Sequence, residues 1–473
     1  MVTNTEVLRM SKNKIESFGK LGDGGTEWST LKKIPFAGEK SAQSAEAFRA
    51  FLENLDKNDL VVYECLNASN DKAAKTEFLE NPDLVHPNNE YGNLNPAQVA
   101  ANLRNLENAE ATLDSFGYNH RKKLLVTILI DDYRKKNNFL AANIAYNNAQ
   151  TESEKQAAAE QHRKANAELY GEPDEATFYC LLFEKLSKIT PETEEDARRL
   201  ARLRSEIGDI PETRVERFKP KAETVARFSE IIKDFYGSFL DHIPSDKQSF
   251  SSQEVVDIIN EILSSEFGGA NVKYRAILDP SSSNASTNHK ERVIKFPLDK
   301  TYSRDRASAL IVHELGAHVM RAIPYLESDI EAFSTELPGN ETFDEGVAKC
   351  LEQAISGRYE DSGIDHYINI GLATFKGKNF REVYDISISL KKLAGEKTTT
   401  VLNAVQRCFR GTGELPNNKD LAYYNGANKV WKYIEEHIDD PGLMDNLFLS
   451  GKANIEDGNQ SRLIYEMRTS GLK

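Results

Sequence analysis

Residues 305–322, DRASALIVHELGAHVMRA, constrain the fold more than any other stretch of the chain. They place His313, Glu314 and His318 within a run that is otherwise almost free of charge, which indicates a buried helix rather than a solvated one. We interpret the three residues as an H-E-x-x-H motif, whose two histidines occupy positions i and i+4 on one helical face. We therefore expect the surrounding domain to support and position this helix.

The chemistry of such a motif is specific. Two imidazoles on one face suit a zinc ion, and Glu314 would stand beside the metal, where it can deprotonate the attacking water. The competing interpretation is a core helix in which His313 and His318 bond only to backbone carbonyls.

A catalytic zinc site needs a third protein ligand. Eight carboxylates lie between the motif and Gly357: Glu327, Asp329, Glu331, Glu336, Glu341, Asp344, Glu345 and Glu352. Glu345 is singled out because Gly346 and Ala348 follow it and small residues would let its helix press on the metal helix, but the residues alone leave this interpretation and the next one equally open. The alternative is that Thr342 and Glu345 form a capping box at a helix start, with no role in metal binding.

The overall composition describes a globular protein with an acidic surface. Hydrophobic residues make up 39 % and charged residues 28 % of the 473-residue chain, with a net charge of −14. This charge argues against nucleic acid or an anionic membrane as the main partner. No signal peptide and no long apolar segment is evident, and four scattered cysteines suggest reduced thiols, so we expect a cytoplasmic protein without membrane insertion.

The pattern along the chain divides it into four parts. Residues 1–40 are expected to form a loosely ordered leader, 41–189 a helical lobe, 190–221 a charged helix or linker, and 222–473 the metallopeptidase domain. In the last part, the β-type runs 272–278 and 291–298 are joined by a polar loop. We expect an α+β, mostly helical fold of the zincin-like (gluzincin) kind, whose edge strand accepts a substrate backbone. A plain hairpin covering a helix explains the two runs equally well.

Four motifs in order resemble the QEGLA-motif, or microtubule-associated tyrosine carboxypeptidase, family of zinc metallopeptidases. They are HELGAH, EGVA at 345–348, RCFRG at 407–411 and KDLAYYNG at 419–426. Weaker similarities, NPDLVHP at 81–87 and LYGEP at 169–173, extend the resemblance over roughly residues 60–435. The resemblance implies that Glu345 is the third zinc ligand, with one zinc per chain.

The later motifs supply candidates for substrate binding. A carboxypeptidase must bind a free α-carboxylate, and Arg407 and Arg410 offer planar guanidinium groups for it, with Lys419 as a point charge. The alternative for each is an ion pair within the fold, for example with Asp420. Tyr423, carried over from the resemblance, is expected to donate to the developing oxyanion or to line the pocket for an aromatic side chain.

These observations favour a zinc carboxypeptidase that removes a C-terminal Tyr or Phe from a protein or peptide tail, tubulin-like by analogy. An acidic tail would require a basic groove, which the sequence suggests only near residues 407–419. Two alternatives stay open. One is a zinc endopeptidase or aminopeptidase on the same scaffold, and the other is a non-enzymatic helical scaffold protein that works through its N-terminal lobe.

Overall fold

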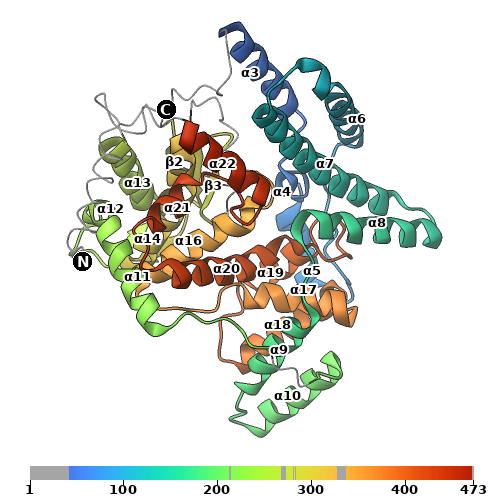
Figure 1. Cartoon of the computed structure of the whole chain (residues 1–473). Helices are drawn as coiled ribbons and strands as arrows, with labels where there is room; N and C mark the ends of the chain where they lie inside the picture. The colour runs from blue at the N-terminus through green and yellow to red at the C-terminus, as the bar shows by residue number, and fades with distance from the viewer. Residues whose placement is uncertain are drawn as a thin grey trace.

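The computed structural model describes residues 42–211, 215–267, 273–280, 282, 284–326 and 337–470. Within these residues the protein is mostly helical with two small sheets (Figure 1), which confirms the predicted α+β class at this level. The leader predicted for residues 1–40 lies outside the described residues. None of the described helices combines the length and apolar character needed to cross a membrane.

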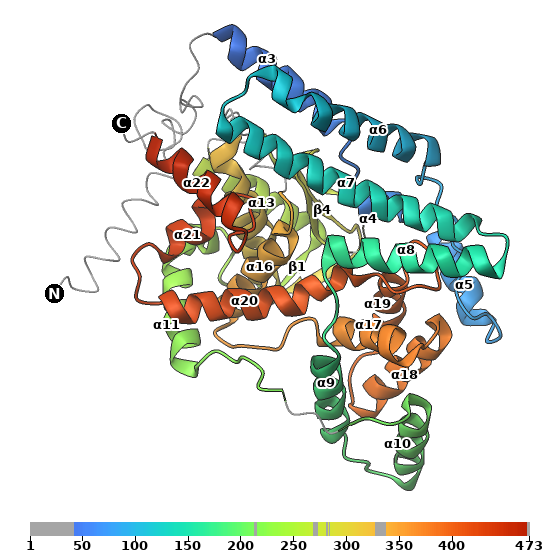
Figure 2. The same cartoon turned by 45° about the vertical axis from the view of Figure 1, so that its right-hand side comes forward.

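Several helices of the N-terminal part begin at well-formed caps. Asn95 and Asn119 accept backbone N–H groups at the starts of two helices, and Thr151 and Glu154 form a complete capping box at a third. The helices are α3 Ala42–Asp56, α4 Val62–Cys65, α5 Asp71–Glu80, α6 Pro96–Thr112, α7 His120–Asn148, α8 Glu152–Tyr170, α9 Glu175–Ser187 and α10 Glu194–Ile207. Helices α6, α7 and α8 pack in series, and α7 and α8 extend together to one side of the molecule (Figure 2).

Two small sheets precede the metal-motif helix. Strand β1 (Ser249–Ser251) pairs antiparallel with β5 (Thr301–Ser303). In the second sheet, β4 (Val293–Phe296) lies between β2 (Arg275–Leu278) and β3 (Ser286–Asn288), parallel to β2 and antiparallel to β3. The two predicted β-type runs therefore contain neighbouring strands, but they form a parallel pair and not a hairpin. The polar loop between them holds a third strand, β3, which the alternation pattern did not reveal.

The remaining helices enclose these sheets and the metal-motif helix. They are α11 Ala222–Phe235, α12 Gly237–Asp241, α13 Ser252–Phe267, α14 Arg304–Ile311, α15 Met320–Ala322, α16 Asn340–Ser356, α17 Ile364–Lys376, α18 Phe380–Leu393, α19 Val401–Cys408, α20 Leu421–His437, α21 Leu443–Leu449 and α22 Gly458–Ser470. Their largest apolar core joins α11, α13, the inner strands, the motif helix, α16 and α20. Helices α9 and α10 share a second core with α17, α18 and α19.

Helices α16 and α20 meet at two glycines. A side-chain carbon on Gly346 would lie 2.4 Å from the carbonyl oxygen of Gly426, and one on Gly426 would lie 2.0 Å from that of Thr342. Gly346 was expected to allow close packing of its helix on the motif helix. This expectation is wrong, because Gly346 lies against α20 instead. The close crossing fixes α16, which carries Glu345, against the helix that carries Tyr423.

Candidate metal centre and cleft

The two histidines of the motif are five residues apart, since Leu315, Gly316 and Ala317 lie between Glu314 and His318. The interpretation as H-E-x-x-H was therefore wrong in spacing. In an α-helix, five residues turn a side chain about 140° away from the first one. Such a helix would not bring both imidazoles to one cation.

The backbone around the motif is not α-helical but forms a wider turn. Residues Val312–Val319 form a π-helix, and the backbone N–H of Met320 donates to the carbonyl of Leu315, five residues earlier. One turn then takes an additional residue, and the rings of His313 and His318 lie on the same side, 5.1 Å apart between centroids.

A buried tyrosine supports the widened turn. Tyr236 is fully buried, and its hydroxyl donates to the carbonyl of Gly316 over 2.9 Å. A side chain at Gly316 would begin 2.9 Å from the tyrosine ring, so glycine is required for this approach. Tyr236 was not among the residues singled out from the sequence, because nothing local connects it with the motif.

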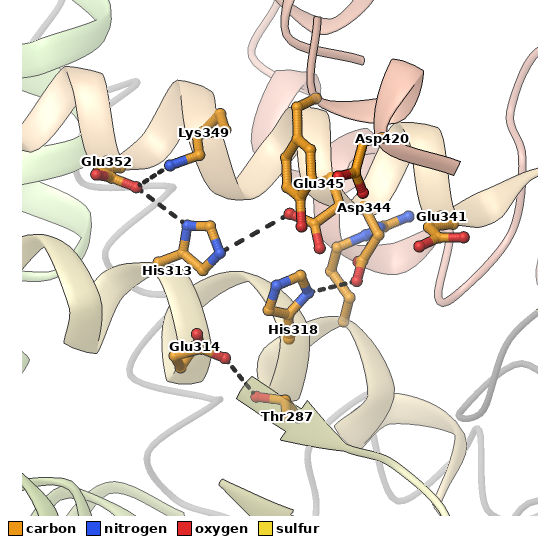
Figure 3. A network of polar contacts seen from close by, with 12 residues as sticks. Thr287, His313, Glu314, His318, Glu341, Asp344, Glu345, Lys349, Glu352 and Asp420 are labelled. Carbon is orange, nitrogen blue, oxygen red and sulfur yellow. Dashed lines mark hydrogen bonds and ion pairs between the residues drawn. The ribbon is translucent and has the colours of Figure 1, made fainter. Parts of the chain in front are cut away.

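Glu345 completes a group of three metal-ligand side chains (Figure 3). One donor atom each from His313, His318 and Glu345 lie within 4.8 Å of one another, and Nε2 of His313 is 4.0 Å from Oε2 of Glu345. Because α16 begins at Asn340, Glu345 does not occupy the capping position that a box with Thr342 would need. The capping interpretation is therefore wrong.

The Nδ1 atom of each histidine lies against a carboxylate. Nδ1 of His318 lies 2.5 Å from Asp344, and Nδ1 of His313 lies 3.2 Å from Glu352. Both Nε2 atoms are thereby left to face Glu345, whose buried Oε2 has no hydrogen-bond partner within the described part of the chain. Paired carboxylate and histidine groups of this kind are typical around metal ligands, so these residues fit a divalent cation such as zinc.

The support of His318 is buried. Asp344 also bonds to Arg321 and to Lys452, and both cations are almost completely buried. Burial would raise the pKa of Asp344, but the charges of Lys452, His318 and Arg321 hold it well below its ordinary value. Burial would lower the pKa of His318, but Asp344 raises it above its ordinary value.

The support of His313 lies nearer the solvent. Glu352 contacts Arg306 and, over 2.9 Å, Lys349. Burial would raise the pKa of Glu352, but His313, Lys349 and Arg306 together hold it far below its ordinary value. Neither Asp344 nor Glu352 was assigned this supporting role from the sequence, where both counted as candidate ligands.

Glu314 is positioned by a strand. Its side chain is buried, and its Oε2 accepts a hydrogen bond from the hydroxyl of Thr287 over 2.8 Å (Figure 3). Thr287 lies on β3, so the strand that the sequence did not reveal reaches directly to the proposed catalytic glutamate.

These residues open into a cleft of about 1220 Å³. Its walls include the N-terminal residues 59–71 and 169–171, the strand region 284–290, the motif helix and residues 403–423. Ten lysines and arginines line it against eight aspartates and glutamates, whereas the whole chain has a net charge of −14. The cleft therefore reverses the sign of the overall charge, and its basic residues extend beyond the predicted region 407–419.

All three predicted substrate-binding residues, Arg407, Arg410 and Lys419, lie at this cleft, and two of them already have partners. Arg407 donates to Asp420 over 2.6 Å and to the hydroxyl of Tyr423 over 3.0 Å. Lys419 forms an ion pair with Glu341. Arg407 and Lys419 thus form ion pairs within the fold, which is the alternative that the sequence had left open for them.

Arg410 differs from them. It lines the same cleft, and its guanidinium has no hydrogen bond or ion pair with any of the residues that the structure describes. Burial and the charge of Arg407 lower the pKa of Arg410, which means that its positive charge is poorly compensated. Among the predicted cations, Arg410 is the one best prepared to receive an anion.

A model of a family described as microtubule-associated tyrosine carboxypeptidase matches residues 211–472, more than half of the chain. The chain belongs to this family. The match includes all eight predicted site residues and identifies a peptidase of the carboxypeptidase class, while the similarities noted at 81–87 and 169–173 lie outside it. Neither a search of curated proteins nor a search of solved structures gave a match.

Proposed function

We propose that this protein is a zinc-dependent metallocarboxypeptidase with a zincin-like catalytic domain. The observation that carries the proposal is the convergence of His313, His318 and Glu345, with each imidazole backed by a carboxylate. A zinc ion held by these three residues would polarise the scissile carbonyl and bring the pKa of water near neutrality.

The surrounding residues would then handle protons and charge. Glu314, held at one oxygen by Thr287, accepts the proton of the attacking water and passes it to the leaving amine. Tyr423, whose hydroxyl is held by Arg407, donates to the oxyanion or contacts the terminal side chain. Tyr423 and Glu345 line the same cleft, which supports a position of the hydroxyl near the reacting carbonyl.

The substrate would be a protein or peptide tail that ends in Tyr or Phe. Arg410 binds the terminal carboxylate, since it is the cleft guanidinium without a partner among the described residues. Arg407 acts through Tyr423, and Lys419 contributes a weaker point charge. The excess of basic residues along the cleft supports an acidic tail, such as the tubulin-like tail that the family description suggests, met in the cytoplasm.

The experiment begins with the zinc content of purified wild type and Glu345→Ala. Each protein is then incubated with a Tyr-ended acidic peptide and its C-terminal amide, and the products are identified by mass spectrometry. We expect about one zinc per chain, lost with Glu345, and removal of a single residue from the free acid alone. Wild type without zinc after metal-replete purification would refute the metalloenzyme proposal.

The same assay separates the alternatives. Cleavage of the amide as well as the acid would favour an endopeptidase or aminopeptidase, whereas full zinc without cleavage of any peptide would favour a scaffold protein. Arg410→Met should raise KM for the free acid by about tenfold or more at unchanged zinc content. Lys419→Met, whose charge is already paired, is the matched control and should have a smaller effect.

A further inference from the structure

The general base is held from a strand and not from its own helix. Thr287 donates to Oε2 of Glu314 and thereby leaves Oε1 as the oxygen available for water. Thr287 sits in the middle of β3, which is an edge strand paired only with β4 within its described three-stranded sheet. The position of Glu314 therefore depends on what holds β3 on its other side.

The N-terminal lobe holds that side. Nζ of Lys290, two residues beyond β3, lies 2.6 Å from the carboxylate of Asp59 and 3.1 Å from its backbone carbonyl. The side chain of Asn288, at the end of β3, donates to Glu64 over 3.3 Å. Asp59 and Glu64 flank the start of α4, so two successive contacts join one short segment of the lobe to this strand.

The anchor on the lobe, Asp59, is charged and largely buried. Asp59 is also bonded to Lys136 of α7 over 3.0 Å, and its side chain is only 13 % exposed. Burial would raise the pKa of Asp59, but Lys136 and Lys290 lower it, so the carboxylate is ionised at neutral pH.

These polar contacts are separate from the packing of the lobe. One of its apolar clusters joins α3, α6 and α7 to residues 325, 337, 453, 463 and 464, a second remains within the lobe, and a third joins α5 and α9 to α17, α18 and α19. None of the three includes a residue of β3. Completing the core thus does not require Lys290 or Asn288 to touch the lobe.

We infer that the N-terminal lobe, which precedes the matched family region, positions the general base by holding strand β3 through Asp59 and Glu64. Thr287 is the positioning residue at the end of this connection. The inference rests on the proposed hydrolytic function for its consequence in catalysis, but the connection itself can be measured without it.

The first test addresses Thr287. Thr287→Val keeps the shape of the side chain and removes the hydroxyl, whereas Thr287→Ser keeps the donor. We expect Val to lower kcat for the Tyr-ended peptide by about tenfold to a hundredfold, with KM and zinc content nearly unchanged, and Ser to restore most of the rate. An equal loss in both variants, or a change confined to KM, would overturn the assignment.

The second test addresses the lobe. Lys290→Met breaks the ion pair with Asp59, and Lys123→Met is the matched control, because Lys123 forms a lobe ion pair with Asp114 at 2.8 Å that does not touch β3. We expect Lys290→Met to lower kcat by about threefold to tenfold and the control to leave it unchanged.

Hydrogen exchange of the zinc-loaded proteins tests the connection independently of activity. Exchange in residues 284–291 should quicken in Lys290→Met but not in Lys123→Met, while β1 and β5 stay protected in both. Unchanged exchange in 284–291 would refute the inference even if the enzyme is active. A wild type that cleaves no peptide would refute the proposed function, and the exchange result would still decide whether the lobe holds β3.

Discussion

The two histidines of the candidate metal centre have the same kind of support in two different environments. Each imidazole touches a carboxylate, and each carboxylate touches two cations. Behind His318, the side chains of Arg321 and Lys452 are 0 % and 1 % exposed, whereas behind His313 those of Arg306 and Lys349 are 46 % and 25 % exposed. Water can compensate a lost charge only behind His313. The same kind of substitution should therefore lower the free energy of unfolding more at Asp344 than at Glu352.

The largest effect is expected from Asp344→Asn. This change preserves size but leaves Arg321 and Lys452 buried without their shared counter-charge, which costs about 3–5 kcal/mol in the free energy of unfolding. Denaturant unfolding of the metal-free protein measures it, and a competition assay should show weaker zinc binding. A loss below about 1 kcal/mol would mean that the buried support is no more important than the exposed one.

A pH series separates His318 from the rest of this effect. A pKa that is raised on folding contributes stability fully below the unfolded pKa and loses it as the pH rises through the folded value. Asp344 raises the pKa of His318, so in metal-free protein the stability difference between wild type and Asp344→Asn should widen from about pH 8 to about pH 6. A difference independent of pH would assign the whole effect to Arg321 and Lys452.

A smaller effect is expected from Glu352→Gln. Because solvent reaches Arg306 and Lys349, we expect a stability loss of about 1 kcal/mol or less, together with roughly tenfold weaker zinc binding from the less firmly oriented His313. High salt should reduce the stability loss further and leave that of Asp344→Asn nearly unchanged. Equal salt dependence in both variants would remove the distinction between the two supports.

The smallest effect is expected from Lys349→Met. Lys349 is partly exposed, and Arg306 still neutralises Glu352 in its absence, so the unfolding free energy should change by less than about 0.5 kcal/mol. Lys452→Met is the buried counterpart. Thermal unfolding of the two variants side by side compares the stability lost at the exposed position with that lost at the buried one.

The parts of the site that could be predicted are those in which the residue type itself indicates a chemical role, as histidine and glutamate indicate metal binding and proton transfer. His313, Glu314 and His318 stand in one apolar run, and the motifs of the family add Glu345 to them. The fold class followed from periodicity, since strong caps and apolar stripes mark the long helices.

The parts that could not be predicted depend on tertiary contacts. β3 consists of Ser, Thr and Asn and is a strand because β4 pairs with it, not because of its own pattern. Asp344 and Glu352 resemble any other acidic residue until the helix places them behind the imidazoles. The five-residue spacing of His313 and His318 can be read from the sequence, but the π-helical turn that brings both imidazoles to one side cannot, because it depends on Gly316 and on the distant Tyr236.

The additional residue in that turn has a consequence for how the chain can change. Deletion of Ala317 would restore a four-residue spacing, and an ordinary α-helix would still present both imidazoles on one face. Because five residues of the π-helical turn and four residues of an α-helical turn both return to nearly the same face, the residues beyond the deletion, Arg321 included, would keep their direction toward Asp344. The additional residue and the widened turn therefore compensate each other, and a deletion that removes both at once would leave the two imidazoles and the buried ion pair in register.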